Sequence, residues 1–216
     1  VDSVFGSGQS VLELPRSVTV LTPELMKRFA LENLGDLGRI GAGTQVANYF
    51  GIPGTPYIRG VKASTFFNGM ARAYQRNEMP VSFGSLEALD LVKGPTPAHM
   101  GPAPEGGYAN FIPKSPYFDR SRGSLGITLG ANNKRRMQLD YGSPVLVGDW
   151  PAAYRVSLTV QDSGSYWRNV DNDYVSLYAA LKIRPNSDFS VFTAAEYYDF
   201  HSNENPGWNR VTQDLI

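Results

Sequence analysis

The sequence predicts a small α/β domain, with a mixed sheet and short helices, followed by antiparallel transmembrane β-barrel strands that are too few to close a barrel. Three observations predict this fold class. The 216 residues include 22 Gly, 15 Pro and 12% aromatic residues, a mixture typical of turn-rich β proteins. The first half places a helix start among short β-branched runs. The second half contains five runs in which apolar and polar residues alternate, as they do along strands with one apolar face.

Composition excludes several classes of protein. The 20 basic and 20 acidic residues balance, so the sequence shows no charged footprint for nucleic acid. Because cysteine is absent, the chain has no disulfide framework and no thiolate metal site. No apolar run approaches the ~18 residues of a membrane-spanning helix, although barrel strands give a much weaker signal than such a helix.

Short strands and helix signals follow one another in the first half. Ser17–Leu21 is a β-branched run, and Thr22-Pro23-Glu24 then supplies an N-cap hydroxyl, a first-turn proline and an acid. The apolar spacing from Leu31 to Ile40 predicts a second helix, which Gly35 and Gly38 weaken. Further strands are predicted at Tyr57–Ile58, Thr65–Phe67, Ala88–Val92 and Tyr108–Ile112, with Asn68-Gly69 as a hairpin turn.

The second half predicts five barrel strands. The alternating runs cover residues 124–131, 136–142, 154–161, 175–184 and 189–198, with Asn132-Asn133 as a tight turn between the first two. Each is close to the ~9–11 residues that a tilted strand needs to cross a bilayer. Their polar faces carry Arg136, Asp140, Arg155, Lys182 and Glu196. A polar barrel lumen accommodates such charges, but so does the solvated face of a soluble sandwich, which remains the alternative at this point.

A set of short motifs in the first half keeps a fixed order. Arg59-Gly60 comes first, then Asp90-Leu-Val-Lys93-Gly94-Pro95, His99-Met-Gly101, Gly106-Gly107 with Asn110, and Lys114. Their order and spacing across about residues 15–116 resemble the plug domain of TonB-dependent outer-membrane receptors. The resemblance divides the chain into a plug domain at residues 1–116 and the N-terminal part of a barrel, about five strands, at residues 117–216.

The resemblance also implies roles for the motif residues. Arg59, Asp90 and Lys93 are expected to form a latch between plug and barrel. A structural role is expected for Gly60, Gly94, Pro95, Gly101, Gly106, Gly107 and Asn110. Two departures from the family pattern stand out: Pro113 replaces a common threonine, and no clear TonB-contact motif is seen near the N-terminus.

Ligand contacts are expected in two loops at the outer end of the plug, residues 67–80 and 95–105. The expected ligand-binding residues are Tyr74, Arg76, Asn77 and His99. Arg72 and Arg76 suit an anionic siderophore complex, whereas Tyr74 equally suits a sugar or a peptide. His99 and His201 are too far apart in the sequence to argue a metal site, so no metal and no cofactor are expected.

The function that the resemblance implies is active import across the outer membrane of a Gram-negative bacterium. The receptor binds a scarce solute, such as a siderophore–iron complex, cobalamin, an oligosaccharide or a peptide, and the TonB energy-transducing complex drives plug movement. Outer-membrane lipid is the other partner. No catalytic constellation such as Gly-x-Ser-x-Gly is present, so no enzyme activity is expected. The alternatives are a passive porin or adhesin and, less favoured, a soluble secreted β-rich enzyme.

Orientation and size follow from the strand count. If the plug joins the first strand at the periplasmic side, the polar loop at 163–172 lies outside and the short turn at Pro185–Asp188 lies in the periplasm. Five strands spaced by about 4.8 Å would enclose a diameter of only about 10 Å. A plug of this length has a radius of gyration of about 13 Å, so we expect an N-terminal fragment of a barrel with about 22 strands.

Overall fold

The protein is described by a computed structural model that places residues 16–49, 52–71, 82–97, 100–101, 105–165, 168 and 170–203. In chain order the elements of the N-terminal domain are β1 (Ser17–Leu21), α1 (Pro23–Arg28), η2 (Leu34–Arg39), β2 (Thr44–Tyr49), β3 (Ile52–Ile58), β4 (Val61–Lys62), β5 (Ser64–Phe67), β6 (Met70–Ala71), η3 (Phe83–Ser85), β7 (Leu86–Lys93) and β8 (Gly107–Pro113). The elements that follow are β9 (Arg122–Leu129), β10 (Arg135–Val147), β11 (Trp150–Asp162), β12 (Asp173–Ile183) and β13 (Val191–His201).

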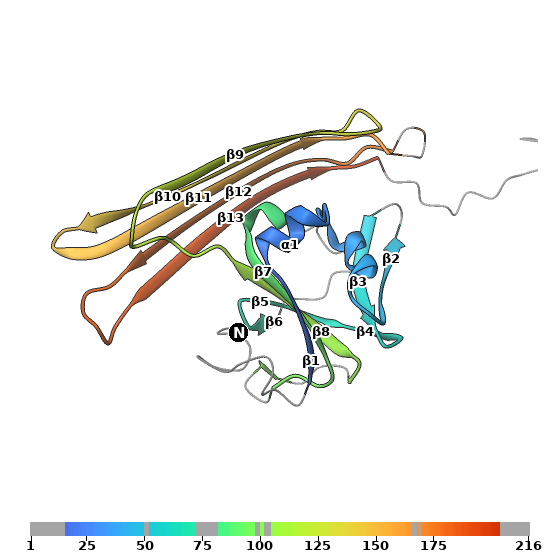
Figure 1. The fold of residues 1–216 in the computed structure, drawn as a ribbon, viewed down its shortest axis with the longest axis horizontal. Coiled ribbons are helices and arrows are strands. Elements are labelled where there is room, and N and C mark those ends of the chain that lie inside the picture. The colour runs from blue at the N-terminus through green and yellow to red at the C-terminus, as the bar shows by residue number, and fades with distance from the viewer. Residues whose placement is uncertain are drawn as a thin grey trace, which may run out of the picture.

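The last five strands form one wide antiparallel sheet, here called the long sheet. Its order is β13-β12-β11-β10-β9, so each strand pairs with its neighbour in sequence. Figure 1 shows it as a curved, open layer extending over the N-terminal domain. All five predicted alternating runs are strands of this sheet, and β10 and β11 are the longest with 13 residues each.

The long sheet buries its polar face and exposes its apolar face. Alternate residues of β11 that are buried include Arg155, Ser157 and Thr159, which are at most 4% exposed. On β9, by contrast, Ile127 and Leu129 are 71% and 77% exposed. A soluble sandwich buries the apolar residues of each strand instead, so the inversion rules out that alternative and matches a transmembrane barrel strand.

A tight turn joins the first two strands of the long sheet. Asn132 and Asn133 have φ values of 57° and 59°, the left-handed conformation that a two-residue hairpin turn requires at both central positions. The Lys134 N–H donates to the Ala131 carbonyl over 3.2 Å and closes the turn, and the Gly130 N–H donates to the Lys134 carbonyl over 3.0 Å. Asparagine tolerates this conformation better than most residues, which confirms the predicted turn.

The N-terminal domain contains two small sheets. The first has the order β1-β7-β8-β5-β6, and the second is β2-β3-β4. Most neighbours are antiparallel, but β5 and β8 are parallel, so the sheet is mixed as predicted. Strands β1, β5, β7 and β8 and the turn at Asn68-Gly69 all lie where the sequence predicted them.

Apolar side chains pack on both faces of the first sheet. Leu89 and Leu91 of β7 face a core that they share with α1 and η2, whereas Val92 faces a smaller core with Phe66 and Tyr108. Successive side chains of a strand point to opposite faces, so β7 contributes to both cores. The larger core also contains Leu21, Met26, Leu31, Leu34, Leu37, Phe83, Leu86, Ala109 and Phe111.

The first predicted helix is confirmed and the second is corrected. Thr22 caps α1 and Pro23 opens it, as expected. The segment from Leu31 to Ile40 forms only the six-residue 3₁₀ helix η2, whose buried residues are Leu34 and Leu37. Its two glycines lower helix propensity, and a capping box between Asn33 and Asp36 starts it late.

Strands β2 and β3 were not fully predicted. No strand was predicted at β2, and the next strand was predicted from Tyr57, whereas β3 begins at Ile52. Pro53 and Pro56 lie within β3 and argue against a strand because proline cannot donate to a ladder. The register between β2 and β3 shifts between Val46 and Asn48, an irregularity that accommodates a strand rich in proline.

Over the described parts of the chain, no helix has the length and apolar character needed to span a bilayer.

Candidate functional site: a buried ionic interface and a neighbouring cavity

Arg155 of β11 is the centre of the interface between the N-terminal domain and the long sheet. Its Nη1 is 2.6 Å from Glu87 Oε2 at the start of β7 and donates to the Ser115 carbonyl over 3.0 Å. Its Nε and Nη2 donate to the two carboxylate oxygens of Asp140 on β10, over 3.1 Å and 2.8 Å. The guanidinium also lies 4.3 Å from the centre of the Tyr117 ring. One side chain therefore joins β7, the segment after β8 and two barrel strands.

Asp140 carries the network on to Lys114. Its Oδ1 accepts from the Ser157 hydroxyl over 2.6 Å, and its Oδ2 is 3.3 Å from Lys114 Nζ. Lys114 Nζ also donates to Ser157 Oγ over 3.3 Å. The Arg155 side chain is 5% exposed and that of Lys114 is 12% exposed. Buried charges of this kind need partners, and each is partnered across the interface.

Burial shifts the pKa of two groups at this interface, Lys114 and Tyr117. Burial lowers the pKa of Lys114, and the neighbouring Asp140 opposes this effect only in part. Burial likewise raises the pKa of the Tyr117 phenol. Both shifts disfavour the charged form of the group relative to water.

Further hydrogen bonds flank the ionic network. The Tyr178 hydroxyl of β12 donates to the Lys114 carbonyl over 2.8 Å. Further along, the Ser85 hydroxyl of η3 donates to Glu196 Oε1 of β13 over 3.1 Å. The N-terminal domain therefore contacts β10, β11, β12 and β13 through polar side chains, which fixes its position against the sheet.

A second ionic contact joins the two parts at a different place. The carboxylate of Glu32, just before η2, lies against Lys134 Nζ and 2.8 Å from Arg136 Nη2. Both cations come from the β9–β10 hairpin. Burial lowers the pKa of Lys134, and the nearby Arg136 adds to this effect.

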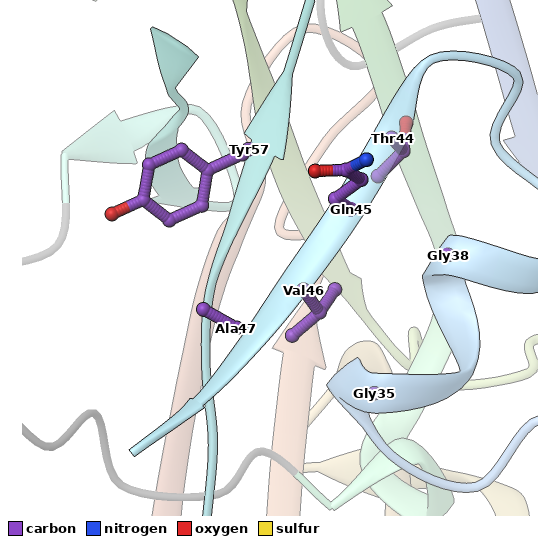
Figure 2. A pocket seen from close by; sticks show the side chains of 7 residues that line it. All are labelled: Gly35, Gly38, Thr44, Gln45, Val46, Ala47 and Tyr57. Atoms are coloured by element: carbon purple, nitrogen blue, oxygen red, sulfur yellow. The ribbon is translucent and has the colours of Figure 1, made fainter. Parts of the chain in front are cut away.

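A cavity of about 510 Å³ lies between η2 and the small β2-β3-β4 sheet. Figure 2 shows Gly35 and Gly38 of η2 on one side, β2 in the middle and the Tyr57 ring extending from β3. Its lining residues are Gly35, Gly38, Thr44, Gln45, Val46, Ala47 and Tyr57. The lining has hydroxyl and amide groups but no charged side chain, so it suits an uncharged group that hydrogen-bonds. In Figure 1 this end of the domain lies on the side of the β9–β10 turn.

The expected latch residues are not brought together as one group. Arg59 is exposed, with φ 55°, in the turn between β3 and β4. Asp90 is fully buried on β7 opposite Asn110, and Lys93 is half-buried opposite Gly107. Arg59 belongs to a different sheet from the other two. The latch role of the three stays a prediction.

Most of the expected structural residues lie between the end of β7 and the start of β8, whereas Asn110 lies within β8 and Gly60 in the turn between β3 and β4. Gly107 has φ 151°, and a Cβ there would meet the Val92 carbonyl at 2.3 Å; one at Gly106 would meet the Ile58 carbonyl at 2.5 Å. Asn110 is buried and its Oδ1 accepts from the Gly69 N–H over 2.9 Å. Gly60, Gly94 and Gly101 also have positive φ values, and the Pro95 carbonyl accepts from the Arg16 guanidinium.

The expected ligand-binding residues Tyr74, Arg76, Asn77 and His99 lie outside the described residues. The structure therefore leaves them as predictions. Among the residues it does describe, no group of three or more histidine, cysteine, aspartate or glutamate side chains could hold a metal ion.

The charged residues on the barrel side of the interface were predicted from the sequence, but most of their partners on the plug side were not. Arg136, Asp140, Arg155 and Glu196 were expected to face a polar lumen, and all four contact the N-terminal domain. Glu32 and Glu87 were not singled out, because a charge before a helix and a charge on a strand are ordinary surface features. The charges on the expected lumen face were the available signal that oppositely charged partners had to exist.

An α/β domain that is docked through buried ion pairs on the polar face of an open barrel sheet defines a plugged β-barrel protein. Residues 10–108 match the family model described as TonB-dependent Receptor Plug Domain. The chain is also 25% identical over 203 residues to the ferripyoverdine receptor of Pseudomonas aeruginosa, which covers 91% of this chain and 24% of that receptor. Residues 10–108 therefore form a TonB-dependent receptor plug domain, and antiparallel strands of the barrel type follow it.

Solved structures show the same fold. The ferripyoverdine receptor of the P. aeruginosa outer membrane, bound to ferripyoverdine, superposes with a TM-score of 0.81 and 22% identity over 93% of this chain and 27% of that chain. The alcaligin outer-membrane receptor of Bordetella pertussis gives a TM-score of 0.77 with 20% identity over 94% of this chain and 35% of that one. The ferric-catecholate import receptor of Escherichia coli K12 gives 0.75 with 20% identity, over 89% and 28%. The chain spans about a quarter of the length of the ferripyoverdine receptor.

Proposed function

We propose that this chain is the plug and first barrel strands of an outer-membrane receptor that imports iron–siderophore complexes in a TonB-dependent manner. The observation that carries the proposal is the plug docked on the polar face of barrel strands, in a chain related over nearly its whole length to a ferripyoverdine receptor. Further relatives in fold bear the names of alcaligin and ferric-catecholate receptors, which favours iron chelates over cobalamin, sugars or peptides.

We assign to each part of the chain the role that was expected from the sequence. Residues 1–116 form the plug and residues 117–216 the N-terminal barrel strands, with loops at the β9–β10 end facing outward. Tyr74, Arg76, Asn77 and His99 contact the iron chelate from the plug. TonB acts on the plug from the periplasm and displaces it, and outer-membrane lipid covers the exposed apolar face of the long sheet.

Uptake of radiolabelled iron tests the proposal. Iron-starved Gram-negative cells that express the full-length gene, in a background without other siderophore receptors, are given ferric pyoverdine, a ferric catecholate or ferric alcaligin. We expect uptake of at least one complex that disappears in a tonB deletion. Uptake that persists without TonB supports the passive-channel alternative, and the absence of uptake for all three complexes contradicts iron–siderophore import.

A further inference from the structure

The short helix η2 lies between two features that the proposed function does not use. On one side its Gly35 and Gly38 line the cavity against β2. At its N-terminal end Glu32 makes the ionic contact with the β9–β10 hairpin. The short segment from Glu32 through η2 therefore touches both a hollow in the plug and a hairpin of the barrel.

The Glu32 contact is screened from water. The side chains of Glu32, Lys134 and Arg136 are 15%, 23% and 9% exposed. Interactions between charges strengthen as the surrounding dielectric falls, and they weaken quickly when one partner moves away or water enters. One carboxylate holds two cations, so its displacement leaves both cations without their shared partner. The contact is accordingly sensitive to small movements of the segment before η2.

The backbone at Glu32 is tied to η2 itself. The Asp36 carboxylate accepts from the N–H groups of Glu32 and Asn33, over 2.9 Å and 3.2 Å. The Asn33 side chain in turn accepts from the Gly35 N–H over 2.8 Å. These hydrogen bonds join Glu32 to a glycine that lines the cavity, so a shift of η2 is transmitted to Glu32 with little slack.

We propose that Glu32 couples occupancy of the η2–β2 cavity to the stability of the β9–β10 hairpin. An uncharged hydrogen-bonding group, such as an amide or hydroxyl of the bound solute, enters between Gly38 and β2 and moves η2 away from that strand. The movement weakens the contact of Glu32 with Lys134 and Arg136 and loosens the hairpin. The proposal deepens the proposed function and rests on it, because the natural occupant would be part of the imported solute.

Position 38 offers an occupant that needs no ligand. A Cβ built on Gly38 would lie 3.7 Å from the Thr44 carbonyl oxygen and 4.0 Å from the Val46 nitrogen, which are ordinary contacts directed at β2. Gly38→Ala should therefore fit, whereas the longer side chain of Gly38→Leu should press against β2. The two variants form a matched pair that differs only in how far the side chain extends.

Hydrogen exchange of the full-length receptor in detergent, followed by mass spectrometry, measures the effect at the hairpin. We expect Gly38→Leu to raise exchange in the peptide covering residues 130–137 by about fivefold and Gly38→Ala by less than about twofold. Glu32→Gln by itself should also raise exchange in this peptide. Adding Gly38→Leu to Glu32→Gln should raise the exchange no further. The distant turn at residues 185–188 serves as the control and should not change.

Two results would overturn the proposed coupling through Glu32. One is unchanged exchange at 130–137 in Gly38→Leu while Glu32→Gln raises it; the other is an equal effect of Gly38→Leu with and without Glu32. If Gly38→Leu does not fold, Gly38→Val places a shorter side chain at the same position and faces the same two criteria. Because the assay contains no siderophore, its failure leaves the uptake result untouched, and failed uptake leaves the exchange result untouched.

Discussion

Arg155 makes the most polar contacts across the interface between plug and barrel. It binds Glu87, the Ser115 carbonyl and Asp140, and the Tyr117 ring covers it. A buried cation with this many partners is costly to leave unpaired. The side chain therefore fixes where the plug docks, and the partners on the plug side lie at the start of β7 and just after β8.

Replacing Arg155 with methionine should loosen the plug. The change leaves Asp140 and Lys114 to pair alone and removes the bond to Glu87, at a cost of about 3–5 kcal/mol. We expect cells with normal amounts of the Arg155→Met receptor to become sensitive to large antibiotics that the outer membrane otherwise excludes. Arg120→Met is the matched control, since Arg120 is exposed and lies 4.0 Å from Asp119. Arg59→Ala tests the predicted latch in the same assay, and unchanged sensitivity there would remove Arg59 from it.

Tyr108 gives the plug a dependence on alkaline pH. Burial raises its pKa to about 12, whereas an unfolded chain has the ordinary value of about 10. The unfolded state then loses its proton first, so the stabilisation is complete below pH 10 and is lost as the pH rises through about 12. Thermal unfolding of the full-length receptor should show a steeper loss of stability over this range than the Tyr108→Phe variant. Identical pH profiles would contradict the assignment.

At the scale of elements, the β9–β10 hairpin depends on two residues with left-handed backbone. Asn132 and Asn133 sit at the centre of the turn, and alanine in this conformation costs about 1–2 kcal/mol per residue. We expect the variant with both asparagines changed to alanine to exchange the amides of Gly130 and Lys134 faster by at least about tenfold. The variant with two glycines is the control and should exchange like the natural protein. Equal exchange in all three would show that the turn does not set the hairpin's stability.

Element η2 shows how a short helix gains a role from its neighbours. Its sequence has low helix propensity, and only six residues adopt the 3₁₀ conformation. Its buried leucines hold it on the larger core, while its glycines leave room against β2. Packing thus places a weakly helical segment where it can move slightly without unfolding the plug.

At the scale of the whole molecule, the two parts have opposite surfaces. The plug encloses two apolar cores. The long sheet exposes apolar side chains on one face, including Leu125 at 64% and Ile127 at 71%. That apolar face needs to be covered by lipid or by further protein. The sheet also has two edge strands, β9 and β13, whose unpaired backbone groups favour association.

The two parts expressed alone should therefore behave differently. In detergent-free buffer, residues 1–116 should stay monomeric, whereas residues 117–216 should aggregate through the apolar face and the open edges. Size-exclusion chromatography with light scattering measures both outcomes. A monomeric fragment of residues 117–216 that melts cooperatively would contradict the membrane assignment of these strands.

The sequence by itself determined the elements whose signals are local. Period-2 alternation gave the five barrel strands, the Thr22-Pro23 pair gave α1, and the paired asparagines gave the hairpin turn. In each case the residues that decide the structure are neighbours in the chain. The charges on the expected lumen face also marked which side of the barrel strands meets the plug, because lipid cannot accommodate them.

Only the tertiary structure decided which plug residues pair with those charged residues. Glu32, Glu87 and Lys114 lie 102, 68 and 43 positions from their partners Lys134, Arg155 and Ser157, and no local pattern specifies such pairs. The same holds for β2 and β3, whose prolines and bulge are tolerated because each strand pairs with a neighbour. The cavity exists because η2 packs over β2 with glycines between them. Contacts between distant segments depend on packing of the whole domain, which the order of residues along one segment does not reveal.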